Sequence, residues 1–146
     1  KDLEKWVNTL IETNDWGVGM THGLTYGYDA FRNPQRLWDH LDQVKARENE
    51  IWVGTFREVA SYIKEREETK LEVVNKKNTL LIAPELKLDQ ELFVEPLTMV
   101  ITGKEIKKVT VKQGKRRLPV QITDDKVLFD FDPYGGMIKV TLKIQK

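Results

Sequence analysis

Residues 106–131 read IKKVTVKQGKRRLPVQITDDKVLFDF, and apolar and polar side chains alternate along three successive runs in this stretch. A period of two is typical of strands that bury one face, because successive side chains point to opposite sides of the sheet. Gln113-Gly114 and Asp124-Asp125 separate the runs and favour tight turns. The stretch therefore predicts antiparallel strands that are joined by short hairpins.

The same alternation continues on both sides of this stretch. It recurs at Leu97–Ile101 and at Ile138–Ile144, and earlier apolar runs at Leu71–Val74 and Thr79–Ala83 add one or two strands. About six or seven short antiparallel strands in succession are typical of a small β-sandwich. We therefore predict an all-β sandwich domain over residues 69–146.

The sequence before this domain has a different pattern. Apolar side chains recur at helical spacing in residues 2–13, in a segment that begins at Asn33-Pro34, and after Thr55. Short apolar runs at residues 16–22 and 51–54 lie between these helices and predict buried strands. Helices that alternate with buried strands predict an α/β unit with a parallel sheet. Two such strands are too few for a stable sheet, so we expect this unit to be part of a larger one.

Charge and aromatic content change at the same place in the chain. The composition, 40% hydrophobic and 32% charged, is that of a globular protein. Residues 1–68 hold 9 Lys and Arg against 13 Asp and Glu, whereas residues 69–146 hold 15 against 10. All four tryptophans lie in the first part. These shifts predict two domains, residues 1–68 and residues 69–146.

Composition also excludes or disfavours several function classes. The chain has no cysteine, which excludes disulfides, thiolate nucleophiles and cysteine-based zinc sites. Its longest apolar runs are far shorter than the roughly 18 residues of a membrane span, so we expect no membrane-spanning segment. With a net charge of +1 and lysines that alternate with apolar residues, we expect no nucleic-acid partner. Ser61, the only serine, has no Gly-x-Ser-x-Gly context and does not indicate a serine hydrolase.

His22 is the strongest candidate for a catalytic side chain. It ends the predicted strand over residues 16–22, and open α/β sheets place their ligands at the carboxyl ends of strands. An imidazole with an ordinary pKa titrates near neutral pH and can act as a general acid or base. A structural histidine bonded to a carbonyl is the alternative. The other histidine, His40, is expected to be a solvated or helix-packing residue, and no His-x-x-x-His pair indicates a metal site in this chain.

Three motifs carry a resemblance to a known family. They are WxxxMxHG from Trp16, LWxxL from Leu37 and EIWVGTFxEVAxYI from Glu50. Together they resemble the closing part of a polysaccharide deacetylase domain, the NodB-like carbohydrate esterases. The resemblance covers roughly residues 1–68 and implies the C-terminal part of a distorted α/β barrel. A trailing β-sandwich is similar to what some members carry after the barrel.

The resemblance implies a function and a site. Family members use a divalent metal, usually zinc, to remove acetyl groups from a carbohydrate polymer. An aspartate and a His-x-x-x-His pair bind this metal. By position, His22 would be the general acid that protonates the leaving group, and Met20 or Leu24 would line the acetyl pocket. The resemblance also implies a secreted or periplasmic location. The metal-binding and general-base motifs lie upstream in the family, so we expect this chain alone to bind no zinc and to be inactive.

Two alternatives remain open for the chain as a whole. It could be a non-catalytic carbohydrate-binding or protein-interaction module, in which Tyr134 is the aromatic platform because Phe93, Phe129 and Phe131 are expected in the core. The sandwich could also be a spacer or a dimer contact. An incomplete sheet in the first domain leaves an unpaired edge, so we expect self-association or pairing with the missing catalytic half.

Overall fold

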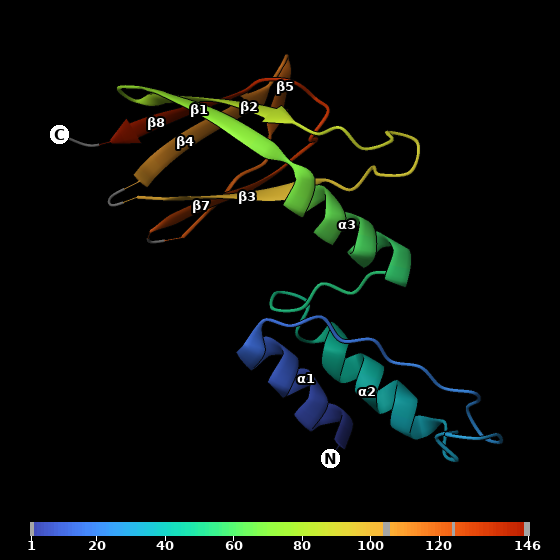
Figure 1. Ribbon diagram of the computed structural model, residues 1–146. Helices are drawn as coiled ribbons and strands as arrows, with labels where there is room; N and C mark the ends of the chain where they lie inside the picture. Colours follow the sequence, from blue (N-terminus) through green and yellow to red (C-terminus); the bar gives the residue numbers. More distant parts are fainter. Residues whose placement is uncertain (1, 104–105, 124, 145–146) are drawn as a thin grey trace. The chain divides into compact units, whose positions relative to one another are not determined.

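The computed structural model describes residues 2–103, 106–123 and 125–144 (Figure 1), so the predicted turn residue Asp124 lies outside the described residues. The chain divides into two compact units, Lys1–Phe56 and Arg57–Lys146, which we name the helical unit and the sandwich unit. The division was expected near residue 68. It lies before the third helix because that helix packs against the strands that follow it.

The helical unit contains α1 (Asp2–Thr13) and α2 (Gln35–Lys45). Both helices carry an apolar stripe, and they pack side by side (Figure 1). Asn33 Oδ1 accepts a hydrogen bond from the Gln35 N–H at 3.0 Å at the start of α2, where the sequence predicted that a helix begins. Arg47 Nη1 donates to Asn8 Oδ1 at 2.6 Å and ties the chain after α2 to α1.

The two strands predicted in this part of the chain are not formed. Residues 16–22 and 51–54 have no regular secondary structure, so the expectation of a parallel sheet in residues 1–68 is wrong for the described residues. Two parallel strands are not stable alone, and the unit supplies no third strand. The apolar side chains of these runs, Val18, Trp52 and Val53, are therefore exposed.

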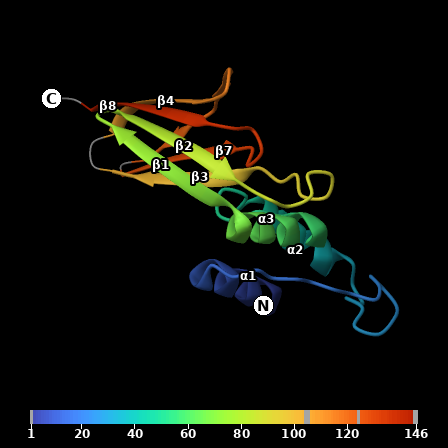
Figure 2. The ribbon, with the colours of Figure 1, turned by 45° about the horizontal axis from the view of Figure 1, so that its top comes forward.

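All of α3 (Phe56–Glu68) except its first residue belongs to the sandwich unit, and this helix runs directly into the first strand (Figure 2). The strands are β1 (Lys70–Lys76), β2 (Thr79–Glu85), β3 (Leu97–Thr102), β4 (Ile106–Gln113), β5 (Arg116–Leu118), β6 (Gln121–Ile122), β7 (Lys126–Phe131) and β8 (Ile138–Ile144). They form a five-stranded sheet in the order β1-β2-β8-β4-β5 and a three-stranded sheet in the order β3-β7-β6 (Figure 1). Every pairing is antiparallel.

The two sheets enclose one core, which confirms the predicted all-β sandwich. Val111 and Val140 face it from the five-stranded sheet, and Val127 faces it from the three-stranded sheet; all three are fully buried. Tyr62 of α3 packs against the same core. Viewed whole, the chain thus combines helices with two antiparallel sheets, and its described residues form no barrel.

One predicted strand is divided between the two sheets. Residues 118–122 alternate in the sequence as a single strand, but Leu118 ends β5 in the five-stranded sheet and Gln121 begins β6 in the other. Pro119 stands between them, and proline has no N–H with which to continue a ladder of hydrogen bonds. Over the described part of the chain, no helix has the length and apolar character needed to cross a membrane.

Candidate functional site

The segment that carries His22, residues 14–33, follows α1 and is named here the His22 loop. Asn14 adopts a left-handed conformation (φ 54°), and the Asp15 N–H donates to the Leu10 carbonyl at 3.1 Å, so α1 ends at a defined point. The chain then passes close over α1. A Cβ added to Gly17 would lie 2.3 Å from Leu10 Cδ1 and 2.6 Å from Trp6 Cζ2, which explains a glycine at this position.

Thr21 closes the tip of the His22 loop. Its hydroxyl lies 2.9 Å from the Gly23 carbonyl and 3.1 Å from the Asp29 carbonyl, and its single proton can be donated to one of them at a time. Gly27 lies opposite the same turn with φ 121°, a conformation that side chains rarely adopt. The sequence reasoning overlooked Thr21, although a threonine next to a candidate histidine and a glycine is a recognisable turn signal.

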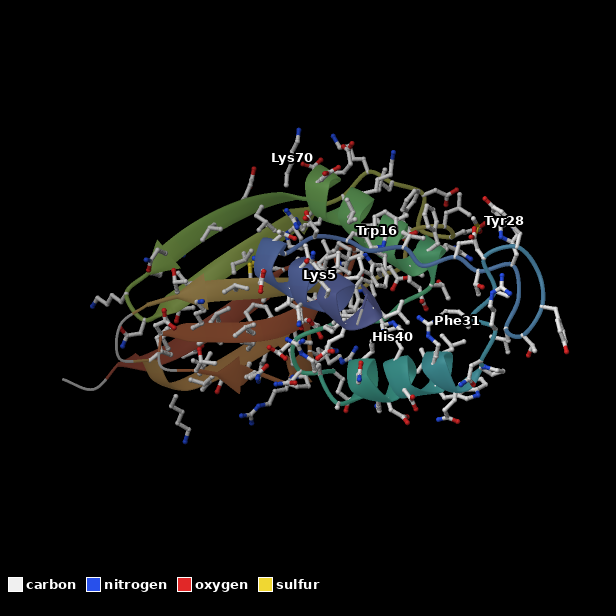
Figure 3. All side chains as sticks on the ribbon, turned by 90° about the horizontal axis from the view of Figure 1, so that it is seen from below. Lys5, Trp16, Tyr28, Phe31, His40 and Lys70 are labelled. Carbon is white, nitrogen blue, oxygen red and sulfur yellow. The ribbon has the colours of Figure 1, made fainter. Side chains whose placement is uncertain are left out.

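His22 therefore lies in a loop rather than at the end of a strand. Its side chain is exposed, and its ring centroid is 6.0 Å from that of Tyr28 in an edge arrangement of 66°. Tyr28 lies on the projecting loop, well apart from Trp16 (Figure 3). Within the described residues the imidazole has no hydrogen-bonding or ionic partner. A structural histidine bonded to a carbonyl is thus not observed, and the ring is accessible to a ligand.

Met20 and Leu24, the expected walls of an acetyl pocket, flank His22 in the same loop. Their side chains are 82% and 39% exposed, so neither of them encloses a pocket in the described structure. Tyr26 and Tyr28 are even more exposed than Leu24. The structure thus brings His22 together with Tyr28, which the sequence reasoning did not single out.

His40 has a packing role. It is half-buried on α2, its ring centroid lies 6.3 Å from that of Trp6 on α1, and its buried Nδ1 has no hydrogen-bonding partner among the described residues. Of the two environments expected for this residue, helix packing is the one observed. His22 and His40 are both in the helical unit, but they face different surroundings.

A shallow groove of about 590 Å³ lies at the C-terminal end of α2. It is lined by Val44, Lys45, Glu48, Asn49, Glu50, Ile51, Trp52 and Val53. Lys45 pairs with Glu48, and Arg47 Nε donates to Glu50 Oε2 at 2.8 Å. The hydrogen bond from Arg47, helped by its charge, lowers the pKa of Glu50. The groove thus combines an exposed tryptophan with charged groups that are already paired.

Tyr134, the expected sugar platform of the sandwich, is engaged within the protein. Its hydroxyl lies 3.3 Å from the Leu88 carbonyl, to which it donates, and partial burial raises the pKa of the phenol. Phe129 and Phe131 are buried in the core as predicted, and Phe93 is half-buried. The freely exposed aromatic side chains therefore belong to the helical unit.

A second titratable group lies inside the sandwich unit. Glu65 of α3 is fully buried; its Oε1 accepts from the Glu95 N–H at 3.1 Å, and its Oε2 has no hydrogen-bonding partner among the described residues. Burial raises the pKa of this carboxyl, the hydrogen bond from the Glu95 N–H partly opposes the rise, and the negative charges of Glu95 and Asp132 add to it. No motif in the sequence indicated this residue, since glutamate in a helix is usually solvated.

Two aspartates of the sandwich unit, Asp130 and Asp132, have hydrogen-bonding partners of their own. Asp130 accepts a hydrogen bond from Thr98 Oγ1 at 2.6 Å, and Asp132 Oδ1 accepts from the Tyr134 N–H at 2.8 Å, so both carboxylates have partners within the sandwich unit. Among residues 2–103, 106–123 and 125–144, no group of three or more His, Asp or Glu side chains is arranged to hold a metal ion. Comparisons of the chain with protein-family models, with curated proteins and with solved structures found no match.

Proposed function

We propose that residues 1–68 are the C-terminal part of a metal-dependent polysaccharide deacetylase and that His22 acts as its general acid. The support is the set of three motifs together with one structural observation: the imidazole of His22 is exposed and unpaired on a loop whose tip Thr21 closes. A ring in that state can approach the sugar and exchange a proton.

The proposed step concerns the leaving group alone. As the bond between the acetyl carbon and the sugar nitrogen or oxygen breaks, the imidazolium of His22 gives its proton to the departing atom and becomes neutral. In a complete member of the family, the divalent metal activates the attacking water. The described residues do not supply its ligands, so no step through the metal is assigned to this chain.

The test is a kinetic comparison in a protein that joins this chain to the metal-binding half of the barrel. We expect His22→Gln to lower kcat about 100-fold or more, with a smaller change in KM, because it removes only the proton donor. His40→Gln is the control, and it should keep the kcat of the parent. Unchanged kcat in His22→Gln would refute the assignment.

A second candidate is non-catalytic binding of a carbohydrate polymer, and the exposure of Tyr26 and Tyr28 favours it. Aromatic faces stack on the apolar faces of sugar rings. Affinity electrophoresis in acetylated polysaccharide tests this candidate: Tyr26→Ser with Tyr28→Ser should abolish retention, and Tyr134→Phe should leave it unchanged. Retention that survives the double substitution would exclude these side chains as the platform.

A polymer substrate also bears on location and partners. Acetylated polysaccharides lie mainly outside the cytoplasm, so we propose a secreted or periplasmic site for the protein and the polymer as its partner. Fractionation of the source cells, with a cytoplasmic enzyme as marker, tests the location. Recovery with the cytoplasmic marker would contradict it.

A further inference from the structure

Strand β1 is an open edge of the sandwich. It pairs with β2 over all seven residues from Lys70 to Lys76 without a bulge, and within the described residues no strand lies along its other side. Every side chain of β1 is exposed. An edge of this kind presents free N–H and C=O groups, and proteins often protect it with proline, a bulge or charged side chains. β1 has no proline and no bulge, and its charged residues Lys70, Glu72 and Lys76 lie on the outer face of the sheet.

The face of β1 that looks toward the core is also incompletely covered. Leu71 and Val73 lie directly opposite Pro84 and Ile82 of β2, and opposite residues of an antiparallel pair share a face. Ile82 is buried in the core, yet Leu71 and Val73 remain half-exposed. Apolar surface of the core-facing side therefore continues beyond the region that the second sheet covers.

The other three edges are less suited to pairing. β5 has three residues, two of them arginines, and β6 has two residues. β3 is longer, with six residues, but its core-facing side chains Leu97, Met99 and Ile101 are buried or packed against the core. Pairing at β1 would cover more apolar surface than pairing at β3.

We infer that β1 is a homodimer interface, at which β1 of a second copy of this chain pairs antiparallel and extends the five-stranded sheet across both molecules. In a symmetric antiparallel pair, a two-fold axis perpendicular to the sheet passes between one residue and the same residue of the other copy. Only a few registers of β1 satisfy this condition, and the length of overlap and the charges together distinguish among them. A register centred on Leu71 would pair Lys70 with Glu72, but it overlaps over fewer residues of β1 than one centred on Val74.

The charges favour a register centred on Val74. It places Glu72 opposite Lys76 of the second copy, and the two-fold axis repeats this pair on the other side of Val74. A register centred on Val73 would place Lys70 opposite Lys76, and one centred on Glu72 would place two glutamates face to face. Glu72, Val74 and Lys76 share the outer face of the sheet, so both ion pairs would flank a central valine contact.

The first test is the oligomeric state of the 146-residue chain by analytical ultracentrifugation over a range of concentrations. We expect a monomer–dimer equilibrium. Val74→Lys should abolish the dimer because it brings two lysines together at the axis. Val100→Lys on β3 is the matched control: Val100 is 49% exposed against 51% for Val74, and the change adds the same charge to the other long edge. It should leave the dimer intact.

Charge reversal then tests the register. Glu72→Lys alone or Lys76→Glu alone creates two like-charge pairs and should weaken the dimer by roughly tenfold or more. The double reversal restores opposite charges and should return the affinity to that of the parent. Circular dichroism and the Tm of each variant separate loss of pairing from loss of fold. A monomeric parent, a dimer that survives Val74→Lys in the folded state, or dissociation by Val100→Lys would each overturn the proposal.

Discussion

At the residue scale, Glu65 makes the stability of the sandwich unit depend on pH. Its carboxyl is buried beside Glu95 and Asp132, and burial, the largest effect, raises the pKa of Glu65 above the ordinary value of 4.5. The phenol of Tyr134 lies near the charges of Glu65 and Asp132. The folded protein therefore binds this proton more tightly than the unfolded chain does. The resulting stability is complete below the unfolded pKa and is lost as the pH rises through the folded pKa.

Glu65→Gln should remove this dependence. The amide keeps an oxygen that can accept from the Glu95 N–H, but it carries no charge to bury. Relative to the parent, we expect the unfolding free energy of the variant to rise between pH 4.5 and pH 7.5, because only the parent loses stability as the pH rises through the raised pKa of Glu65. Urea unfolding at both pH values measures the difference, with the exposed Glu67→Gln on the same helix as control. If the unfolding free energies of parent and variant differ by the same amount at both pH values, Glu65 is not the group that makes stability depend on pH.

At the scale of elements, Gln113 joins β4 to the turn between β7 and β8. Its Nε2 donates to the carbonyls of Asp132 (2.6 Å) and Gly136 (3.2 Å), and its Oε1 accepts from the Asp132 N–H at 3.1 Å. A Cβ on Gly135 would lie 2.7 Å from the same amide nitrogen, so the turn is closely fitted to this side chain. Gln113 is itself buried.

Gln113→Leu should therefore be strongly destabilising although its size is nearly conserved. The substitution leaves three backbone groups without their partner in a buried site, and we expect a loss of about 2–4 kcal/mol in the free energy of unfolding. Chemical denaturation measures the loss, and Gln121→Leu, an exposed glutamine on β6, should change stability by less than about 0.5 kcal/mol. Equal effects of the two substitutions would contradict the role of the amide.

The same elements show which features the sequence could predict. Alternation identified the strands of the sandwich and the buried positions Val127, Phe129 and Phe131, because a two-residue period directly reports a half-buried strand. The short apolar runs at residues 16–22 and 51–54 predicted strands wrongly, because such a run does not specify a pairing partner. His22 could be identified from its motif, but its exposure and its edge contact with Tyr28 depend on the fold of a loop.

At the scale of the whole molecule, the two units differ in how much core they have. Of the twelve buried apolar side chains among the described residues, Val7 alone belongs to the helical unit and the others lie in the sandwich unit. Burial of apolar surface is the main favourable term in folding, so the helical unit has little stability of its own. A small core is compatible with the expectation that residues 1–68 are part of a larger domain. That expectation stays a prediction.

Hydrogen exchange followed by mass spectrometry should reveal this difference directly. Amides of α1 and α2 are expected to exchange through frequent local opening, whereas those of β4, β7 and β8 should exchange only through global unfolding and remain protected far longer. A fragment that spans Arg57–Lys146 provides the control: it should keep the protection pattern of the strands, since the core and α3 are both within it. Equal protection in both units, or loss of strand protection in the fragment, would mean that the helical unit contributes to the same cooperative fold. Slow exchange in the strands together with fast exchange in α1 and α2 would mean that the helical unit opens independently of the sandwich unit, as expected of a part that a partner stabilises.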